Sequence, residues 1–153
     1  MRKIDDMDRK ILRALQADGS LNAGDIAEKV GLSQSPCWRR ISRLEEQGVI
    51  LGRSVLLDHK KLGFKMVVFV RIRLSKHGRK SLDEFARAAA ALPEVQVVQL
   101  LLGEIDYRLR VIVRDLDDYN RLLRDHLINL PGVQEIQSSV LLDEAKNTLA
   151  LPI

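Results

Sequence analysis

The sequence predicts an α+β protein of two modules, a helical N-terminal module and a C-terminal module in which strands and helices alternate. Three observations carry this prediction. Apolar residues recur at helical spacing in three consecutive segments before residue 48, and apolar and polar residues alternate in extended segments after residue 66. Glycine or proline separates these segments. The 153 residues suffice for two small domains.

Composition excludes several classes of protein. With 46% hydrophobic and 30% charged residues, the chain can form cores and remain soluble. It contains no apolar run of about 18 residues, the length that a transmembrane helix needs. Its first eight residues alternate charges where a secretory signal would be apolar. The single cysteine, Cys37, cannot form an internal disulfide, which fits a reducing compartment. We therefore expect a cytoplasmic protein with no membrane partner.

The first two helices have clear boundaries. Helix one has apolar residues at helical spacing over 7–15, starts with acidic residues that favour the helix dipole, and stops at Asp18-Gly19-Ser20. Helix two starts after Asn22, a residue type preferred at helix N-termini, and ends at Gly31. Both are predicted to support the helix that follows them.

The third helix is predicted to have two different faces. It begins near Ser33 or Ser35 and ends before Gly48, with apolar residues in one sector and arginines in the other. A helix of this kind can lie in a DNA groove while its back packs on a small core. The predicted contacts to base edges or phosphates are Ser33, Gln34, Ser35, Arg39 and Arg43, whereas Arg40 is expected to brace the fold or to meet phosphate.

An extended segment is predicted at 49–57, as a wing or return strand with Arg53 as a phosphate contact. With the three helices it forms the outline of a winged helix-turn-helix domain over residues 1–58. Double-stranded DNA is the expected partner. The formal net charge is +4, but residues 1–60 carry 11 basic and 9 acidic side chains and residues 61–153 carry 14 and 12. Binding must therefore depend on local clustering of charge. A short charged connection follows at residues 59–66.

The second module, residues 67–153, follows the order strand, helix, strand, strand, helix, strand, which is typical of a ferredoxin-like βαββαβ domain. The strands are expected at 67–74, 95–102, 107–113 and 133–142, the helices at 81–92 and 116–130, and a tight hairpin at 103–106. The two helices would cover one face of the sheet. The bare face favours contact with a partner.

Four arginines are predicted to share that bare face. If the apolar residues of the two central strands point toward the helices, the outward residues are Arg71, Arg73, Arg108 and Arg110. Like charges on neighbouring strands repel. One hypothesis is a polar dimer interface in which the arginines pair with carboxylates such as Glu135 and Asp106, or with those of a bound ligand. The alternative is a partly hydrated face with extended arginine side chains.

In its ordered motifs, the chain resembles the Lrp/AsnC family, the feast/famine transcription regulators, over essentially its whole length. The matching segments are Ile4-Asp5 with Asp8–Leu12, Val30–Cys37 with Arg40, Leu44-Glu45 with Gly48–Ile50, Leu62-Gly63, Pro93–Val95, Gly103 with Asp106-Tyr107, Leu130–Val133, and Lys146 with Thr148 and Leu151-Pro152.

This resemblance implies a sequence-specific DNA-binding domain followed by a RAM-type domain that dimerises and binds a small effector, commonly an amino acid. It also implies assembly of dimers into larger, often octameric, discs. By analogy the effector would lie at the hairpin, with Gly103, Glu104 and Asp106 as ligands and Arg108 as a further candidate. The family often has a hydroxyl residue at the position of Leu102 and an apolar one at that of Arg108, so the effector's identity stays open.

Two other functions remain as alternatives. Related folds include decarboxylases that act on haem-precursor tetrapyrroles, and an architectural DNA-binding protein would need no effector. The sequence shows no phosphate-binding glycine loop and no catalytic triad or acid pair. Its histidines, His59, His77 and His126, have no cysteine or carboxylate at metal-ligand spacing. We therefore expect neither enzymatic activity nor a metal or other cofactor.

Overall fold

The computed structural model of the chain describes residues 3–76 and 78–153. Its internal contacts divide it into two compact units. One contains the chain up to Leu56 together with Lys146–Ile153, and the other contains Leu57–Ala145. This division differs from the expected one, which assigned the last eight residues to the second module. No helix in the described residues is both long and apolar enough to cross a membrane.

Three helices make up the first unit: α1 (Asp6–Ala17), α2 (Ala23–Val30) and α3 (Gln34–Glu46). The boundaries of α2 are those that the sequence predicts. The Asn22 side chain accepts hydrogen bonds from the backbone N–H groups of Gly24 and Asp25 and so caps α2. Gly31 ends that helix in the left-handed conformation, at φ +73°, which favours glycine because it has no Cβ. Between the helices lies a core of Ile11, Ile26, Ala27, Cys37 and Ile41.

The predicted wing strand is absent. Residues 51–58 form neither helix nor strand, and no described strand pairs with them. Leu51, Val55 and Leu56 are largely exposed. A strand needs a neighbour whose N–H and C=O groups it can bond. The first unit supplies none.

The last residues of the chain belong to the first unit because α1 binds their backbone. Gln16 accepts a hydrogen bond from the N–H of Leu151 (2.6 Å) and donates one to its carbonyl oxygen (3.2 Å). Arg13 Nε donates to the carbonyl oxygen of Ile153 (2.5 Å). Sequence patterning gave no sign of this contact, because both partners are polar groups on exposed surfaces.

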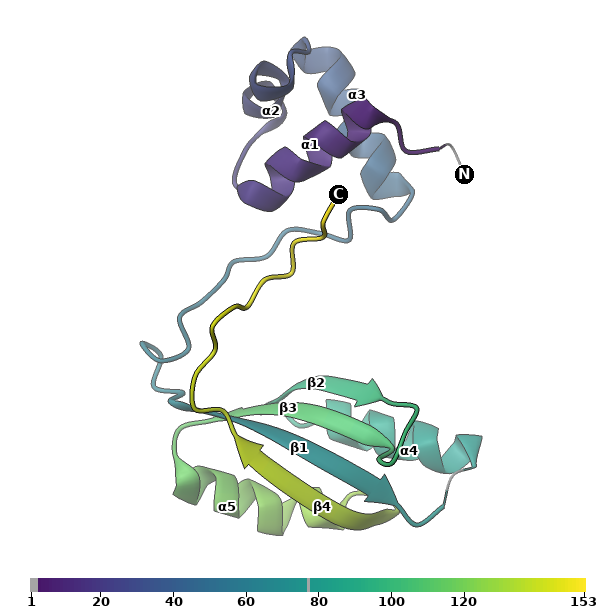
Figure 1. Cartoon of the computed structure of the whole chain (residues 1–153), viewed down its shortest axis with the longest axis vertical. Coiled ribbons are helices and arrows are strands. Elements are labelled where there is room, and N and C mark those ends of the chain that lie inside the picture. Colours follow the sequence, from purple (N-terminus) through teal and green to yellow (C-terminus); the bar gives the residue numbers. More distant parts are fainter. Residues whose placement is uncertain (1–2, 77) are drawn as a thin grey trace. The chain divides into compact units, whose positions relative to one another are not determined.

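The second unit is the expected βαββαβ domain. Its elements are β1 (Met66–Leu74), α4 (Arg79–Ala90), β2 (Val95–Leu100), β3 (Tyr107–Val113), α5 (Leu116–Asp125) and β4 (Val133–Val140). The sheet has the order β2-β3-β1-β4, with every pair antiparallel. Helices α4 and α5 lie on one side of it (Figure 1).

The core lies between the sheet and these helices. It contains the inward residues of the central strands, such as Val70, Ile72 and Leu109, together with Phe85 from α4. The Phe85 ring lies 4.6 Å from that of Tyr107, centroid to centroid. The Tyr107 hydroxyl donates to the carbonyl oxygen of Leu82, so this buried polar group is satisfied.

Several predicted boundaries need correction. The first helix of the module, predicted at 81–92, is Arg79–Ala90, and the last strand ends at Val140 rather than at residue 142. The second helix of the module is not continuous to residue 130, because α5 ends at Asp125 and a short 3-10 helix follows at Leu127–Asn129. The break is at His126, whose φ of −127° and ψ of −61° are not helical. Strand β2 ends at Leu100, two residues early. The predicted tight hairpin is therefore a longer loop over residues 101–106, closed by the bond from the N–H of Leu101 to the carbonyl oxygen of Asp106 (2.8 Å).

Candidate nucleic-acid interface and ligand hairpin

Helix α3 presents its N-terminus to solvent. Ser33 is the N-cap residue, yet its side chain makes no capping hydrogen bond, and Ser33, Gln34 and Ser35 are all exposed. The first N–H groups of a helix have no intrahelical acceptor, and the helix dipole makes this end attractive to anions. Both backbone and side-chain donors at this point are therefore available to phosphate or to base edges.

The two faces of α3 are those that its periodicity predicted. Cys37 and Leu44 are fully buried, and Ile41 is nearly so. Burial raises the pKa of the Cys37 thiol, as expected for a small apolar core residue rather than a reactive one. On the opposite side Arg39 is exposed and forms no hydrogen bond or ion pair with any described residue. The sector that Arg39 occupies can contact an external ligand.

Trp38 is a surface residue of α3 that is not among the predicted DNA contacts. It is 60% exposed beside Arg39. Tryptophan is enriched at interfaces, where its ring supplies a large apolar contact area. Its signal in the sequence was weak, because a single tryptophan at a flank position is equally compatible with partial burial.

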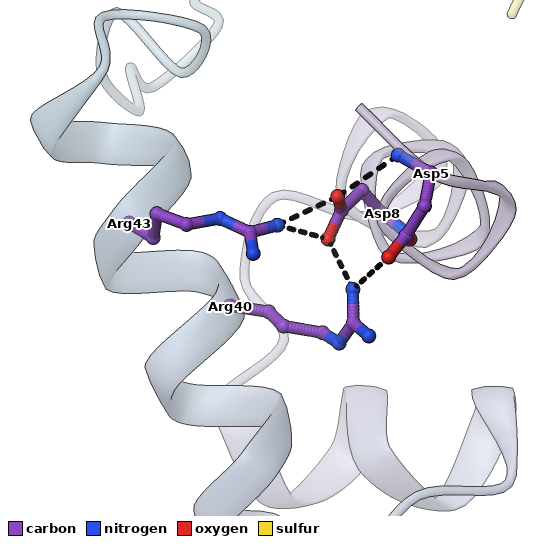
Figure 2. A network of polar contacts seen from close by, with 4 residues as sticks. All are labelled: Asp5, Asp8, Arg40 and Arg43. Carbon is purple, nitrogen blue, oxygen red and sulfur yellow. Dashed lines mark hydrogen bonds and ion pairs between the residues drawn. The ribbon is translucent and has the colours of Figure 1, made fainter. Parts of the chain in front are cut away.

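A buried carboxylate fixes the orientation of α3. Asp8, in the first turn of α1, is fully buried and accepts charge-assisted hydrogen bonds from two arginines of α3 (Figure 2). Arg40 Nη1 lies 2.7 Å from Asp8 Oδ1 and 2.7 Å from Asp5 Oδ2. Arg43 Nη2 lies 2.6 Å from both oxygens of Asp8. The network joins the start of α1 to the middle of α3.

The same two carboxylates also start α1. Asp8 N–H donates to Asp5 Oδ1 (2.8 Å), and Asp5 N–H donates to Asp8 Oδ2 (3.1 Å), which completes a reciprocal capping box. The hydrogen bond from Arg40 is the main reason that the pKa of Asp5 falls from 3.8 to about 2, and the bond from the Asp8 backbone contributes further. The acidic partners in turn raise the pKa of Arg40.

This network changes the interpretation of Arg43. The sequence predicted a base or phosphate contact, whereas the structure turns its guanidinium toward α1 and leaves the side chain 23% exposed. The buried Nε of Arg43 has no hydrogen-bond partner among the residues that the structure describes. Sequence spacing could not separate Arg39 from Arg43, since both lie on the same sector of the helix. The distinction depends on which arginine lies over Asp8.

Arg53 also has an intramolecular partner. Its Nη1 donates to the carbonyl oxygens of Gly19 (3.2 Å) and Leu21 (2.8 Å), in the turn between α1 and α2. It therefore ties the segment after α3 back to the helices. Its predicted contact with phosphate stays a prediction. Such a contact would use the N–H donors of the guanidinium group that these two bonds do not occupy.

The loop between β2 and β3, the expected ligand hairpin, is tied to β1 at three points, one of which is the hydrogen bond from the N–H of Asp106 to the carbonyl oxygen of Ile72 (3.0 Å). Asp106 Oδ2 accepts a hydrogen bond from the N–H of Leu74 (2.7 Å). Arg73 Nε and Nη2 donate to the carbonyl oxygen of Glu104 (3.2 and 3.0 Å). Gly103 and Glu104 are exposed, and nothing lies within 4 Å of the position that a Cβ of Gly103 would occupy. The loop is held at its base and open at its tip.

Arg108 lies apart from that tip. Its Nε and Nη2 donate to Gln99 Oε1 (3.1 and 2.7 Å), and its guanidinium carbon lies 5.8 Å from the ring centroid of Phe69. The structure thus places Arg108 on the bare face of the sheet, and its role as a ligand of the hairpin stays a prediction. The alternation predicted for the four arginines is correct: inward neighbours such as Val70 and Leu109 are fully buried.

In the parts of the chain that the structure describes, no three His, Cys, Asp or Glu side chains form a group that could hold a metal ion. His59 Nδ1 lies 2.6 Å from the carbonyl oxygen of Phe64, where it stabilises the turn before β1. His77, one of the three histidines of the sequence, lies outside the described residues.

Comparison with known protein families matches both units. Residues 4–50 match a winged helix-turn-helix DNA-binding domain, and residues 67–151 match the Lrp/AsnC ligand binding domain. The first match ends at residue 50, so it includes only the first two residues of the segment in which a wing strand is predicted. The second spans the sheet, its two helices and the ligand hairpin.

Similar proteins of known name are transcription regulators. The chain is 40% identical to the leucine-responsive regulatory protein of Haemophilus influenzae, over 95% of this chain and 87% of that protein. It is 39% identical to the glutamate uptake regulatory protein of Zymomonas mobilis, over 100% and 93%. It is 35% identical to the DNA-binding transcriptional activator DecR of Escherichia coli, over 98% and 99%.

Solved structures agree with this. An AsnC family transcriptional regulator from Agrobacterium tumefaciens superposes with a TM-score of 0.91 at 41% identity, over 97% of this chain and 96% of that one. A transcriptional regulator from Neisseria meningitidis, solved as a complex with L-Met, gives 0.93 at 34% identity, over 98% and 97%.

Removing the Asp8 carboxylate should destabilise the first unit. Asp8→Ala leaves two arginines without their shared acceptor and opens the capping box, so we expect a loss of about 3 kcal/mol in the free energy of unfolding. Urea unfolding followed by far-UV circular dichroism measures it. Asp6→Ala is the matched control, because Asp6 is an exposed acid in the same helical turn. Equal losses in the two variants would contradict the role given to Asp8.

Asp5 should make the stability of the first unit sensitive to acid. Its pKa in the folded state is about 2, below the value of 3.8 in an unfolded chain. The ionised form is therefore stabilised by folding, and this contribution is complete above about pH 4 and lost as the pH falls toward 2. Melting temperatures between pH 2 and pH 5 should fall less steeply in Asp5→Asn than in the wild type. An unchanged slope would refute the prediction.

Proposed function

Because this chain belongs to the Lrp/AsnC family of transcription regulators, we propose that it binds DNA through the exposed sector of α3 and an amino acid or similar metabolite through the loop between β2 and β3. Its N-terminal unit is a helix-turn-helix DNA-binding domain, and its second unit is the family's ligand-binding domain. The observation that carries the proposal is the exposed N-terminus of α3, which the buried Asp8 network holds in place.

The DNA contacts proposed are of two kinds. Ser33, Gln34 and Ser35 would reach base edges or phosphate from the start of α3, where free N–H groups add to their side-chain donors. Arg39 and Trp38 would contact the duplex one turn further along the helix. Arg40, Arg43 and Arg53 would act mainly by orienting these groups, because their guanidinium groups already have protein partners.

The effector site proposed is the tip of the loop between β2 and β3. Exposed backbone around Gly103 offers amide donors to a carboxylate, and the carboxylates of Glu104 and Asp106 offer acceptors to an ammonium group. The relative from Neisseria meningitidis was solved with L-Met, which supports an amino-acid class of ligand. Leu100, Leu101 and Leu102 are exposed beside the tip, which favours an apolar side chain on the ligand.

We further propose a homo-dimer that assembles into larger oligomers in the cytoplasm, without enzymatic activity. Large apolar side chains are exposed in the irregular segment after α3 and next to the hairpin, namely Leu51, Val55, Leu56, Leu57, Leu101 and Leu102. Such exposure in a soluble protein usually marks an interface. Dimerisation would present two α3 helices to successive turns of one DNA face, and assembly of dimers would make the binding multivalent.

Arg39 and Arg43 should differ in the property that they control. The DNA probe is a duplex selected from random sequences for binding to the wild-type protein. Arg39→Ala should weaken binding to this duplex about tenfold or more while leaving the melting temperature of the protein unchanged. Arg43→Ala should instead lower the melting temperature, because it breaks the bonds to Asp8. Binding can be followed by the fluorescence of Trp38, the only tryptophan. Arg79→Ala, on α4, is the control, and normal affinity of the Arg39→Ala variant would contradict the interface.

An amino acid should stabilise the protein. Screening the twenty amino acids by thermal shift should identify at least one that raises the melting temperature or changes the oligomer size, because a ligand that binds only the folded state stabilises it by mass action. Asp106→Asn should abolish the shift, since the amide keeps an acceptor for the Leu74 N–H but loses the charge. Asp83→Asn, on α4, should retain it. A screen without any response would favour the architectural alternative.

A further inference from the structure

Helix α3 is covered on two sides, which leaves one open sector. Cys37 and Leu44 are fully buried on one side, and on the next side Arg40 and Arg43 turn toward α1 (Figure 2). The open sector faces away from both. At about 100° per residue, it contains, from one edge to the other, Gln34, Glu45, Trp38, Ser42, Ser35, Glu46 and Arg39. Trp38 therefore lies inside this sector, and Arg39 lies at its edge.

The two ends of the open sector differ in charge. Glu45 and Glu46 are exposed in the last turn of α3, where they repel phosphate. The first turn has no acidic residue, and its N–H groups lack acceptors within the helix. The part of the sector that suits DNA therefore runs from Ser33 to Ser42. Trp38 lies in the middle of that part.

The indole ring of Trp38 projects beyond its neighbours. Ser35 and Ser42 lie one turn before and one turn after it on the same row of the helix, and both have short side chains. The ring is 60% exposed, so most of it is available to a partner. It carries no charge, and its only polar group is the Nε1–H donor. Such a side chain suits a partner that is apolar and has an acceptor close by.

We propose that Trp38 reads a thymine in the major groove by packing its ring against the C5-methyl group of the base. That methyl is the apolar group among the base edges of the groove, and the neighbouring O4 is an acceptor that suits the indole N–H. Cytosine presents a donor in place of O4 and has no methyl group. The inference rests on the proposed DNA-binding function and deepens it, because it names the base that one residue of α3 selects.

The position of Trp38 favours a base over the DNA backbone. When a helix lies in the major groove, side chains at the edges of its exposed sector meet the flanking phosphates, and those nearer the middle meet the base edges. Arg39, at the edge, has the charge that a phosphate requires, whereas Trp38 has none. Contact with a methyl group also removes apolar surface of the ring from water, which favours binding.

The test uses the full chain and a fluorescently labelled duplex selected from random sequences for binding to the wild-type protein. Each thymidine of the duplex is replaced in turn by deoxyuridine, which removes only the C5-methyl group. At one thymine of the site, replacement should weaken wild-type binding about fourfold, the value of one buried methyl group. Fluorescence anisotropy measures the affinity. Trp38→Ala should bind the unmodified duplex more weakly and should show no further loss with deoxyuridine at that thymine.

Two further variants separate this contact from DNA binding in general. Arg39→Ala is the matched control: it should bind both duplexes more weakly but keep the difference between them. Trp38→Phe retains an apolar ring and should keep most of that difference, which covers poor folding of the alanine variant. Undiminished sensitivity to deoxyuridine in Trp38→Ala, or equal wild-type affinity at every replaced thymine, would overturn the proposal and leave the DNA-binding function intact. A wild-type chain that selects no duplex would instead contradict that function.

Discussion

The buried carboxylate of Asp8 is the constraint on which the DNA-binding unit depends. A charge removed from water is costly unless it is paired and hydrogen-bonded, and Asp8 meets this condition with Arg40 and Arg43 together with the N–H of Asp5. Because the arginines come from α3 and the acid from α1, satisfying this one group also sets the position of α3. The side chains of α3 that do not take part in this network then form the exposed surface of the helix.

Electrostatics in this unit is consequently local. The first unit has nearly balanced charge, and two of its arginines, Arg40 and Arg43, form ion pairs with carboxylates of α1 and its N-cap. The groups proposed to contact DNA include Arg39, the N-terminus of α3 with its dipole, and the polar groups of its first turn. Such a modest set of contacts supports weak binding by one unit and makes several linked units more effective. The exposed apolar residues that would link such units lie elsewhere in the chain, at positions 51–57 after α3 and beside the loop between β2 and β3.

The second unit also brings arginines close together, but not all of them have a carboxylate partner. Arg73 finds Glu135 and the backbone of Glu104, and in doing so holds the base of the effector loop. Arg71, two residues earlier on the same strand, has no equivalent partner among the described residues. The alternation of apolar and charged residues along β1 and β3 specifies which face is buried. It leaves open how a row of like charges is balanced.

The sequence by itself determined the periodic features: three helices with their caps, the βαββαβ order, the buried stripe of Cys37, Ile41 and Leu44, and the face on which the four arginines lie. These depend on local spacing, which the chain encodes directly. Tertiary structure alone decided which arginines stay free, because Arg43 and Arg39 share a sector and only the approach of Asp8, 35 residues away, separates them. It also decided that 51–58 forms no strand and that Gln16 binds Leu151, since pairing partners distant in sequence leave no periodic signal.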